Sequence, residues 1–170
     1  MGESIRRLIQ AIRFEREAFV WMDFSDRATG DAVIFIAVTQ VLLIIGSSGS
    51  VLGPLQRGGV IGLAYEFLQA LIFWLVFAGI TYLASRHLFR GDASYAAVMR
   101  IAGFAYPTLL MLLAADIVFN FPLSFILGSV WFLAVVANGV RYVADLPVPN
   151  AWLSAVLGIA GWLIVAAIFF

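Results

Sequence analysis

The stretch RGDASYAAVMRIAGFAYP, at residues 90–107, leads from a charged, turn-forming segment directly into a long apolar helix. Arg90 and Asp92 flank a glycine in the turn, and Arg100 follows within the first turns of the helix. Apolar runs fill the sequence on both sides, so these charges separate two blocks of membrane span. We therefore interpret Arg90, Asp92 and Arg100 as residues that anchor a loop on one side of a membrane.

The apolar part of the same stretch contains a helix-bending signal. Gly103 and Pro107 both lie inside the run that follows the charged turn. Proline has no amide hydrogen to donate, and its ring clashes with the preceding helical turn. We therefore predict a kink over residues 103–106.

The composition excludes a water-soluble globular domain. Of the 170 residues, 64% are apolar and 12% are charged, and the mean hydropathy of +1.04 is far above that of soluble domains. The 10 basic residues are all arginines and are balanced by 10 acidic residues, which leaves no basic field for nucleic acid. Cysteine is absent, which excludes disulfides, iron–sulfur clusters and thiol nucleophiles.

The apolar runs predict an all-α, polytopic membrane protein with five transmembrane helices. Each run is close to the ~20 residues that a helix needs to cross ~30 Å of hydrocarbon. The membrane domain is expected over residues 25–170, with spans at about 30–48, 60–83, 96–119, 123–143 and 151–170.

Residues 1–24 have a different pattern from the spans. Apolar residues recur at helical spacing with arginines on the opposite side, although Phe14 falls off the apolar stripe and Arg16 falls on it. We predict one amphipathic helix over residues 3–22. Two placements stay open, because such a helix lies either in the lipid headgroup region or against the protein's own cytoplasmic face.

The arginines also predict the orientation of the chain. A Gly/Ser/Pro-rich loop is expected at residues 46–59, and Arg57 is its only charged residue. With a cytoplasmic N-terminus, the other nine arginines all lie inside and only Arg57 lies outside. We therefore expect the N-terminus in the cytoplasm and the C-terminus on the outer side.

Two carboxylates at membrane depth are the candidates for chemistry. Glu66 and Gln69 lie one turn apart in the second span, and Asp116 lies near the far end of the third. If these helices adjoin, Glu66 and Asp116 form an acidic pair that shares a proton or holds a cation. In the alternative that we favour, Glu66 bonds Gln69 and a neighbouring helix, while Asp116 faces interfacial water or pairs with Arg57.

The sequence contains few residues that are suited to enzyme catalysis. The only histidine, His87, follows the second span among arginines, so a serine nucleophile within the bilayer has no histidine base. Haem ligation by two histidines of one chain is likewise excluded. We expect no catalytic residue, cofactor or metal site.

The fifth predicted span carries a seam of small residues. Ala151, Ser154, Gly158 and Gly161 recur on one face of it, which lets another helix approach closely. We expect contacts with other membrane proteins, or with a second copy of the chain, through such small-residue faces, together with membrane lipids.

The residues of the opening stretch carry a family resemblance. Gly91, Ser94-Tyr95, Arg100, Gly103-Phe104-Ala105 and Pro107 form a pattern that resembles the middle of the Yip family (Ypt-interacting protein one domain), and the similarity continues through residues 126–131 and Asn138-Gly139-Val140. The resemblance covers about residues 89–170 and implies a compact, prokaryotic member in the bacterial cytoplasmic membrane. The acidic Asp-Leu-Tyr-Gly-Pro box of many eukaryotic members is absent.

Two functions of different classes follow from these observations. The first is a non-enzymatic adaptor, scaffold or membrane-organising component, including an accessory subunit of a larger membrane complex. The alternative is a small permease or channel that uses Glu66, Gln69, Asp116 and the kink at Pro107. A polar cavity that reaches the membrane midplane favours transport, whereas a solid apolar bundle favours the scaffold.

Overall fold

The computed structural model describes residues 2–48, 52–113 and 121–169, which contain helices and no strand. Five helices in this part of the chain are long and apolar enough to cross a membrane, and this confirms the predicted all-α polytopic fold. The spans are built from α3 (Arg27–Ser48), α4 (Leu52–Leu83), α5 (Tyr95–Ala105) with its 3₁₀ continuation η2 (Tyr106–Leu110), α7 (Phe121–Val143) and α8 (Val148–Phe169).

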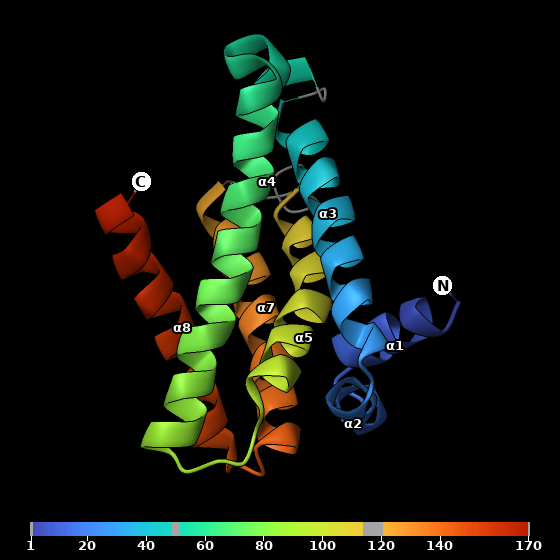
Figure 1. Ribbon diagram of the computed structural model, residues 1–170, viewed down its shortest axis with the longest axis vertical. Helices are drawn as coiled ribbons and strands as arrows, with labels where there is room; N and C mark the ends of the chain where they lie inside the picture. Colours follow the sequence, from blue (N-terminus) through green and yellow to red (C-terminus); the bar gives the residue numbers. More distant parts are fainter. Residues whose placement is uncertain (1, 49–51, 114–120, 170) are drawn as a thin grey trace.

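Two short helices replace the single amphipathic helix that the sequence predicts for residues 3–22. They are α1 (Gly2–Ile12) and α2 (Arg16–Phe24), and the chain breaks between them at Phe14, which adopts a left-handed φ of 63°. The break lets the Phe14 ring lie 5.5 Å from the Trp131 ring of α7, so the residue that fell off the apolar stripe packs on the bundle instead. In Figure 1 both helices lie across one end of the spans.

The two N-terminal helices differ in what their apolar residues contact. In α2, Ala18, Phe19 and Met22 are fully buried, and α2 contacts α5 and α7. In α1, Ile5 and Ile9 keep 50% and 46% of their surface exposed. Helix α2 therefore lies against the protein itself, which is one of the two placements left open. Helix α1 leaves an apolar face that the protein does not cover.

The loop expected at residues 46–59 is helical over most of its length. Helix α3 continues to Ser48 and α4 begins at Leu52, so only residues 49–51, outside the described part, separate them. Pro54 is compatible with α4 because it stands in the first turn, where a backbone N–H has no partner within the helix. At Gly59, with φ of 60°, α4 is kinked between two helical segments, and glycine adopts this conformation without a steric penalty.

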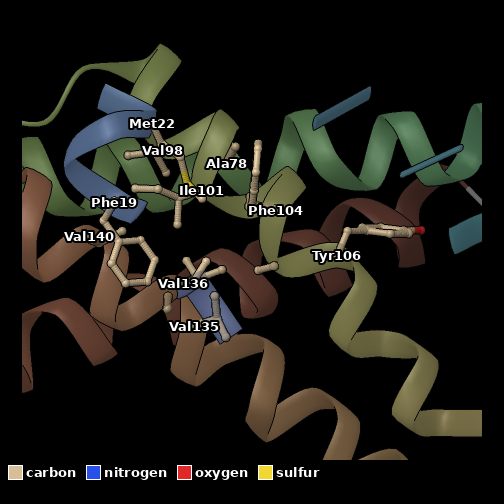
Figure 2. Close-up of a cluster of buried hydrophobic side chains, with 14 of the residues drawn as sticks. Phe19, Met22, Ala78, Val98, Ile101, Phe104, Tyr106, Val135, Val136 and Val140 are labelled. Carbon is tan, nitrogen blue, oxygen red and sulfur yellow. The ribbon is translucent and has the colours of Figure 1, made fainter. Parts of the chain in front are cut away.

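Aromatic rings fill the interior between α4, α5, α7 and α8. The Phe77 and Phe132 rings are 5.0 Å apart, and Phe73 lies 5.3 Å from Trp162 of α8 and 5.9 Å from Phe132. Figure 2 shows the adjoining layer, in which Phe19 from α2 meets valines of α7 and Ile101 of α5. This part of the bundle is a packed apolar core.

The irregular segment of the third span lies later than the predicted kink at residues 103–106. Helix α5 runs to Ala105, and the 3₁₀ segment η2 then covers Tyr106–Leu110. Pro107 has no N–H for the Gly103 carbonyl, and the Tyr106 N–H donates to that carbonyl as well as to Ala102. Proline therefore changes the helix type from Tyr106 onward.

The charged turn connects α4 to α5 along the same end of the bundle as α1 and α2 (Figure 1). Helix α4 continues into a π-helical turn, η1 (Ala84–Leu88), and Arg90 then adopts a left-handed φ of 58°. A β-carbon on Gly91 would lie 2.9 Å from the Ala144 β-carbon, so only glycine lets this connection lie against the one between α7 and α8.

The small-residue seam of α8 packs against α4 of the same chain. Ser154 and Gly158 are buried, and a β-carbon on Gly158 would collide with side chains of Phe77 and Thr81. The close approach expected from the seam therefore occurs within the bundle. The exposed residues of α8 are large and apolar and include Leu163 and Ile164.

Candidate functional site

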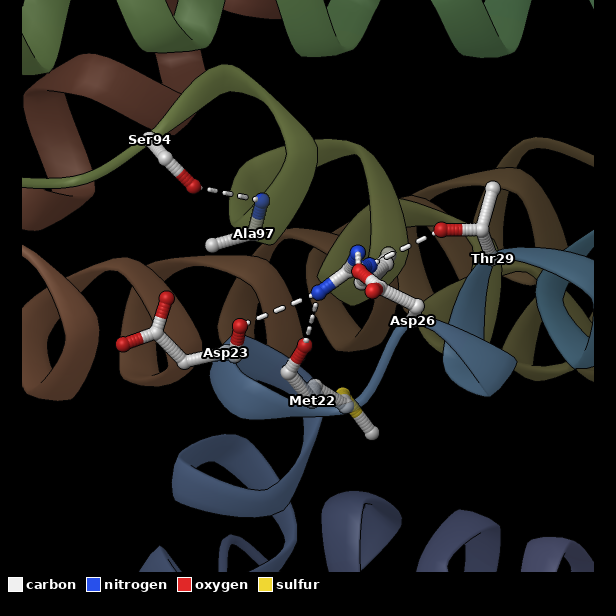
Figure 3. Close-up of polar contacts among 7 residues, drawn as sticks. Met22, Asp23, Asp26, Thr29, Ser94 and Ala97 are labelled. Atoms are coloured by element: carbon white, nitrogen blue, oxygen red, sulfur yellow. Dashed lines mark hydrogen bonds and ion pairs between the residues drawn. The ribbon is translucent and has the colours of Figure 1, made fainter.

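The most heavily bonded side chain that the structure describes is Arg100, which is only 6% exposed. Its Nε donates to Thr29 Oγ1 at 2.8 Å, and one terminal nitrogen donates to the carbonyls of Met22 at 3.1 Å and Asp23 at 3.0 Å. Its other terminal nitrogen lies 2.7 Å from Asp26 Oδ1, in a hydrogen-bonded ion pair. Figure 3 shows these acceptors gathered around the connection between α2 and α3.

The acceptors are groups that two helix ends leave without partners. The last carbonyls of a helix have no intrahelical donor, and Met22 and Asp23 lie in the last turn of α2. A cation near a helix C-terminus is also stabilised by the helix dipole. Asp26 immediately precedes α3, and Thr29 lies in its first turn. Arg100 of α5 therefore holds the end of α2 and the start of α3 together.

This arrangement is suited to structure rather than to chemistry. All three guanidinium nitrogens of Arg100 already donate hydrogen bonds, so little capacity is left for another ligand. Arginine stays protonated, which makes it unsuitable as a proton carrier. The sequence predicts Arg100 as a residue that anchors the loop before the third span. The structure instead buries the Arg100 side chain, which lies in α5 as the predicted span bounds require but contacts α2 and α3.

A second polar contact joins α5 to α4 at Met99, the residue before Arg100. The Trp74 indole N–H donates to the Met99 carbonyl at 2.7 Å. A β-carbon on Gly103 would lie 2.5 Å from the Ala32 β-carbon and 3.3 Å from Trp74 Nε1. Gly103 therefore permits the close approach of α3 and α4 to α5, whereas the sequence predicts that Gly103 takes part in a kink.

The intramembrane polar residues do not assemble into a common site within the described residues. The Gln69 amide donates to the Tyr65 hydroxyl at 3.0 Å, and Glu66, partly exposed, forms neither a hydrogen bond nor an ion pair with any described residue. Asp116 lies outside the described residues, so the predicted acidic pair stays a prediction. The favoured bond between Glu66 and Gln69 is not formed, and the Gln69 amide donates to the Tyr65 hydroxyl instead.

The remaining sequence candidates lie apart from Arg100. Arg90 and Asp92 are exposed and form no ion pair with each other. The Asn138 amide donates to the Ala134 carbonyl of its own helix at 2.8 Å. Asn138 is thus satisfied within α7, while the adjacent Gly139 lets Ile101 and Phe19 approach closely.

Sequence reasoning missed the partners of Arg100. Asp26 and Thr29 have the side chains of helix-capping residues, and an arginine within an apolar helical run needs acceptors of this kind. The capping residues and the intramembrane arginine together indicate that Arg100 bonds the region around Asp26. The acceptors lie between 71 and 78 residues before Arg100, so the sequence does not show that they are neighbours.

The N-terminal helix pair has its own fixed contacts with the spans. The buried Ser4 hydroxyl of α1 donates to Asp31 Oδ2 of α3 at 2.8 Å, and the Arg7 guanidinium lies 5.8 Å from the Trp21 ring of α2. Together with Arg100, these contacts attach both helices to one end of the bundle. We call this end, formed by α1, α2 and the connections before α5 and α8, the N-terminal face.

Among the described residues, no three histidine, cysteine, aspartate or glutamate side chains gather as metal ligands would. The polar groups described above serve helix contacts, and most of the charged residues gather at the N-terminal face. Comparisons with family models, curated proteins and solved structures found no match to this chain.

Proposed function

We propose that this protein is a non-enzymatic integral membrane protein of the Yip type, which acts as an adaptor, scaffold or membrane-organising component through its N-terminal face. The proposal rests chiefly on one observation, the buried Arg100 that fixes α2 to the start of α3. Attachment of α2 through a buried, fully bonded arginine favours a preorganised surface, which a docking platform requires.

The packing of the interior supports a scaffold over a permease. Phe73, Phe77 and Phe132 fill the space between α4, α7 and α8, where a transport path would need polar, wettable walls. The Tyr106 hydroxyl donates to Gln40 at 3.2 Å, so these two polar groups of the spans satisfy each other.

The distribution of arginines supports a cytoplasmic placement of the N-terminal face. Helices α1 and α2, the connection before α5 and the end of α7 meet there, and they contain most of the arginines in the chain. We place this face in the cytoplasm of a bacterial cell and the C-terminus on the outer side of the cytoplasmic membrane. An accessory subunit of a larger complex would use the same face.

Affinity capture after chemical cross-linking in native membranes tests the scaffold. The tagged full chain should recover one reproducible set of proteins. The variant Arg6→Ala/Arg13→Ala, which changes exposed residues of the N-terminal face, should lose that set. The control Leu163→Ala/Ile164→Ala, on the exposed side of α8, should retain it. Repeated recovery of the protein alone would overturn the proposal.

Flux measurements provide the opposite test. Proteoliposomes that contain the parent protein should show no more proton or cation flux than empty liposomes. Flux in the parent that disappears in Glu66→Gln would replace the scaffold by a permease.

A further inference from the structure

A charged cleft of about 430 Å³ opens at the N-terminal face, between α2, the end of α7 and the start of α8. Its volume falls within the range of about 300 to 1,000 Å³ that is common for small-ligand sites. The charged residues that line it come from separate segments: Arg16 begins α2, Arg141 lies in the last turn of α7, and Asp145 follows that helix.

The two arginines of the cleft have charges that the protein does not neutralise. Arg7, Arg27 and Arg100 each lie within ion-pair distance of an acidic side chain. Arg16 and Arg141 are exposed and form no ion pair with any described residue. Arg141 only stacks beside its neighbour Tyr142, with the guanidinium 5.4 Å from the ring centre. The cleft therefore holds two available cations and one carboxylate, Asp145.

The surroundings of the cleft combine this charge with apolar surface. Arg16 also borders a second cleft, of about 550 Å³, which Arg7, Glu17, Val20 and Trp21 line between α1 and α2. Val20 and Phe24 on α2 expose apolar side chains. Apolar side chains beside guanidinium groups are typical of the boundary between headgroups and acyl chains.

We propose that the cleft binds the headgroup of a phosphoethanolamine lipid. The phosphate lies between the guanidinium groups of Arg16 and Arg141, which form charge-assisted hydrogen bonds with phosphate oxygens. The headgroup ammonium pairs with Asp145, which accounts for the acidic residue in an otherwise cationic cleft. The acyl chains lie along the apolar residues of α2. This binding depends on membrane insertion and is independent of the scaffold function.

Native mass spectrometry of the full chain in detergent tests the site. Phosphatidylethanolamine should be retained in preference to phosphatidylglycerol and to diacylglycerol, which lacks the phosphate. The variant Arg16→Gln/Arg141→Gln should reduce that retention by at least about tenfold, because each lost charge-assisted bond removes about a factor of ten. Arg13→Gln/Arg90→Gln, which changes two exposed arginines outside the cleft, should leave it unchanged.

Two further variants separate the contributions of phosphate and ammonium. Arg16→Lys/Arg141→Lys keeps both charges and should retain most of the lipid, which also shows that the fold tolerates substitution at these exposed positions. Asp145→Asn should remove the preference for phosphatidylethanolamine over phosphatidylglycerol.

Three results would overturn the proposal. These are equal retention of diacylglycerol, equal loss in the Arg13→Gln/Arg90→Gln control, and displacement of the lipid by soluble glycerophosphoethanolamine at the lipid's own concentration. The last result would identify the free headgroup, rather than the membrane lipid, as the ligand.

Discussion

Helices α5 and α8 are both predicted from apolar sequence, yet they occupy opposite positions in the bundle. In the most apolar window of 18 residues, 56% of the residues are buried in the α5 span and 17% in the α8 span. Helix α5 contacts α1, α2, α3, α4 and α7, whereas α8 packs chiefly against α4 and α7. The third span is therefore the centre of the bundle, and the last span is peripheral.

The two helices also use different means of attachment. Helix α5 contributes a buried arginine, a backbone carbonyl that accepts from Trp74 and a glycine at a close crossing. Helix α8 contributes small residues on one side and large exposed apolar residues on the other. Substitutions that remove polar contacts of α5 should therefore be more damaging than equivalent changes on α8.

The largest effect is expected for Arg100→Leu. This substitution leaves the Met22 and Asp23 carbonyls without their donor, and it should lower the free energy of unfolding by about 2 to 4 kcal/mol. Arg27→Leu is the matched control, because the exposed Arg27 has only a 3.7 Å pair with Asp31 and should cost less than about 1 kcal/mol. Denaturant unfolding in detergent measures both, and equal losses would show that burial of Arg100 contributes nothing special.

Gly103→Ala should have the next largest effect. The added methyl group collides with Ala32 of α3, including its α-carbon at 3.2 Å, and overpacking of this kind costs about 1 to 3 kcal/mol. Gly79→Ala on α4 meets only Tyr95 at 3.8 Å and should be neutral or slightly stabilising. Thermal unfolding of the pair checks the difference, and a tolerated Gly103→Ala would contradict the role of Gly103 at a close helix crossing.

Gly158→Ala applies the same change to the peripheral helix. Its nearest neighbours are the side chains of Phe77 and Thr81, which can adjust more easily than the Ala32 backbone at Gly103, so we expect a loss of about 1 kcal/mol. Gly30→Ala, which has open space around it, controls for the change in helix propensity. A larger loss for Gly158→Ala than for Gly103→Ala would reverse the ranking of the two helices.

Trp74→Phe should give the smallest effect. The phenyl ring keeps most of the apolar packing, and only the 2.7 Å hydrogen bond to the Met99 carbonyl is lost, for about 0.5 to 1.5 kcal/mol. The control Trp131→Phe keeps an aromatic ring beside Phe14 and removes no hydrogen bond to a described residue, so it should change stability less. Identical unfolding curves for the parent protein and Trp74→Phe would contradict this contribution.

The sequence predicted the helices far better than their contacts. Long apolar runs identify the five spans because the bilayer thickness sets a minimum helix length. The seam around Gly158 correctly predicted a close helix approach, although the pattern contains no information on which helix approaches. A hydropathy scale gives every arginine the same strongly polar value, whether or not acceptors surround it. The burial of Arg100 was therefore not predicted.

The N-terminal region shows a second limit of pattern reasoning. The break at Phe14 contains no glycine or proline, and it lets the rings of Phe14 and Phe19 pack against Trp131 and Tyr142 of α7. The interruption of the apolar stripe at Phe14 and Arg16 was visible in the sequence, but the packing that the break permits was not. The same limit applies to the charged cleft, whose arginines lie 125 positions apart in the sequence (16 and 141).

Cysteine accessibility tests most directly the central claim that Arg100 fixes α2 to the bundle. The chain contains no cysteine, so single introduced thiols report one position each. Ala18→Cys on α2 and Ala155→Cys on α8 replace fully buried residues, whereas Arg13→Cys replaces an exposed polar residue and should react with a maleimide in every background. Adding Arg100→Leu should make the thiol at position 18 reactive while the thiol at position 155 stays protected. Unchanged protection at position 18 would contradict the account.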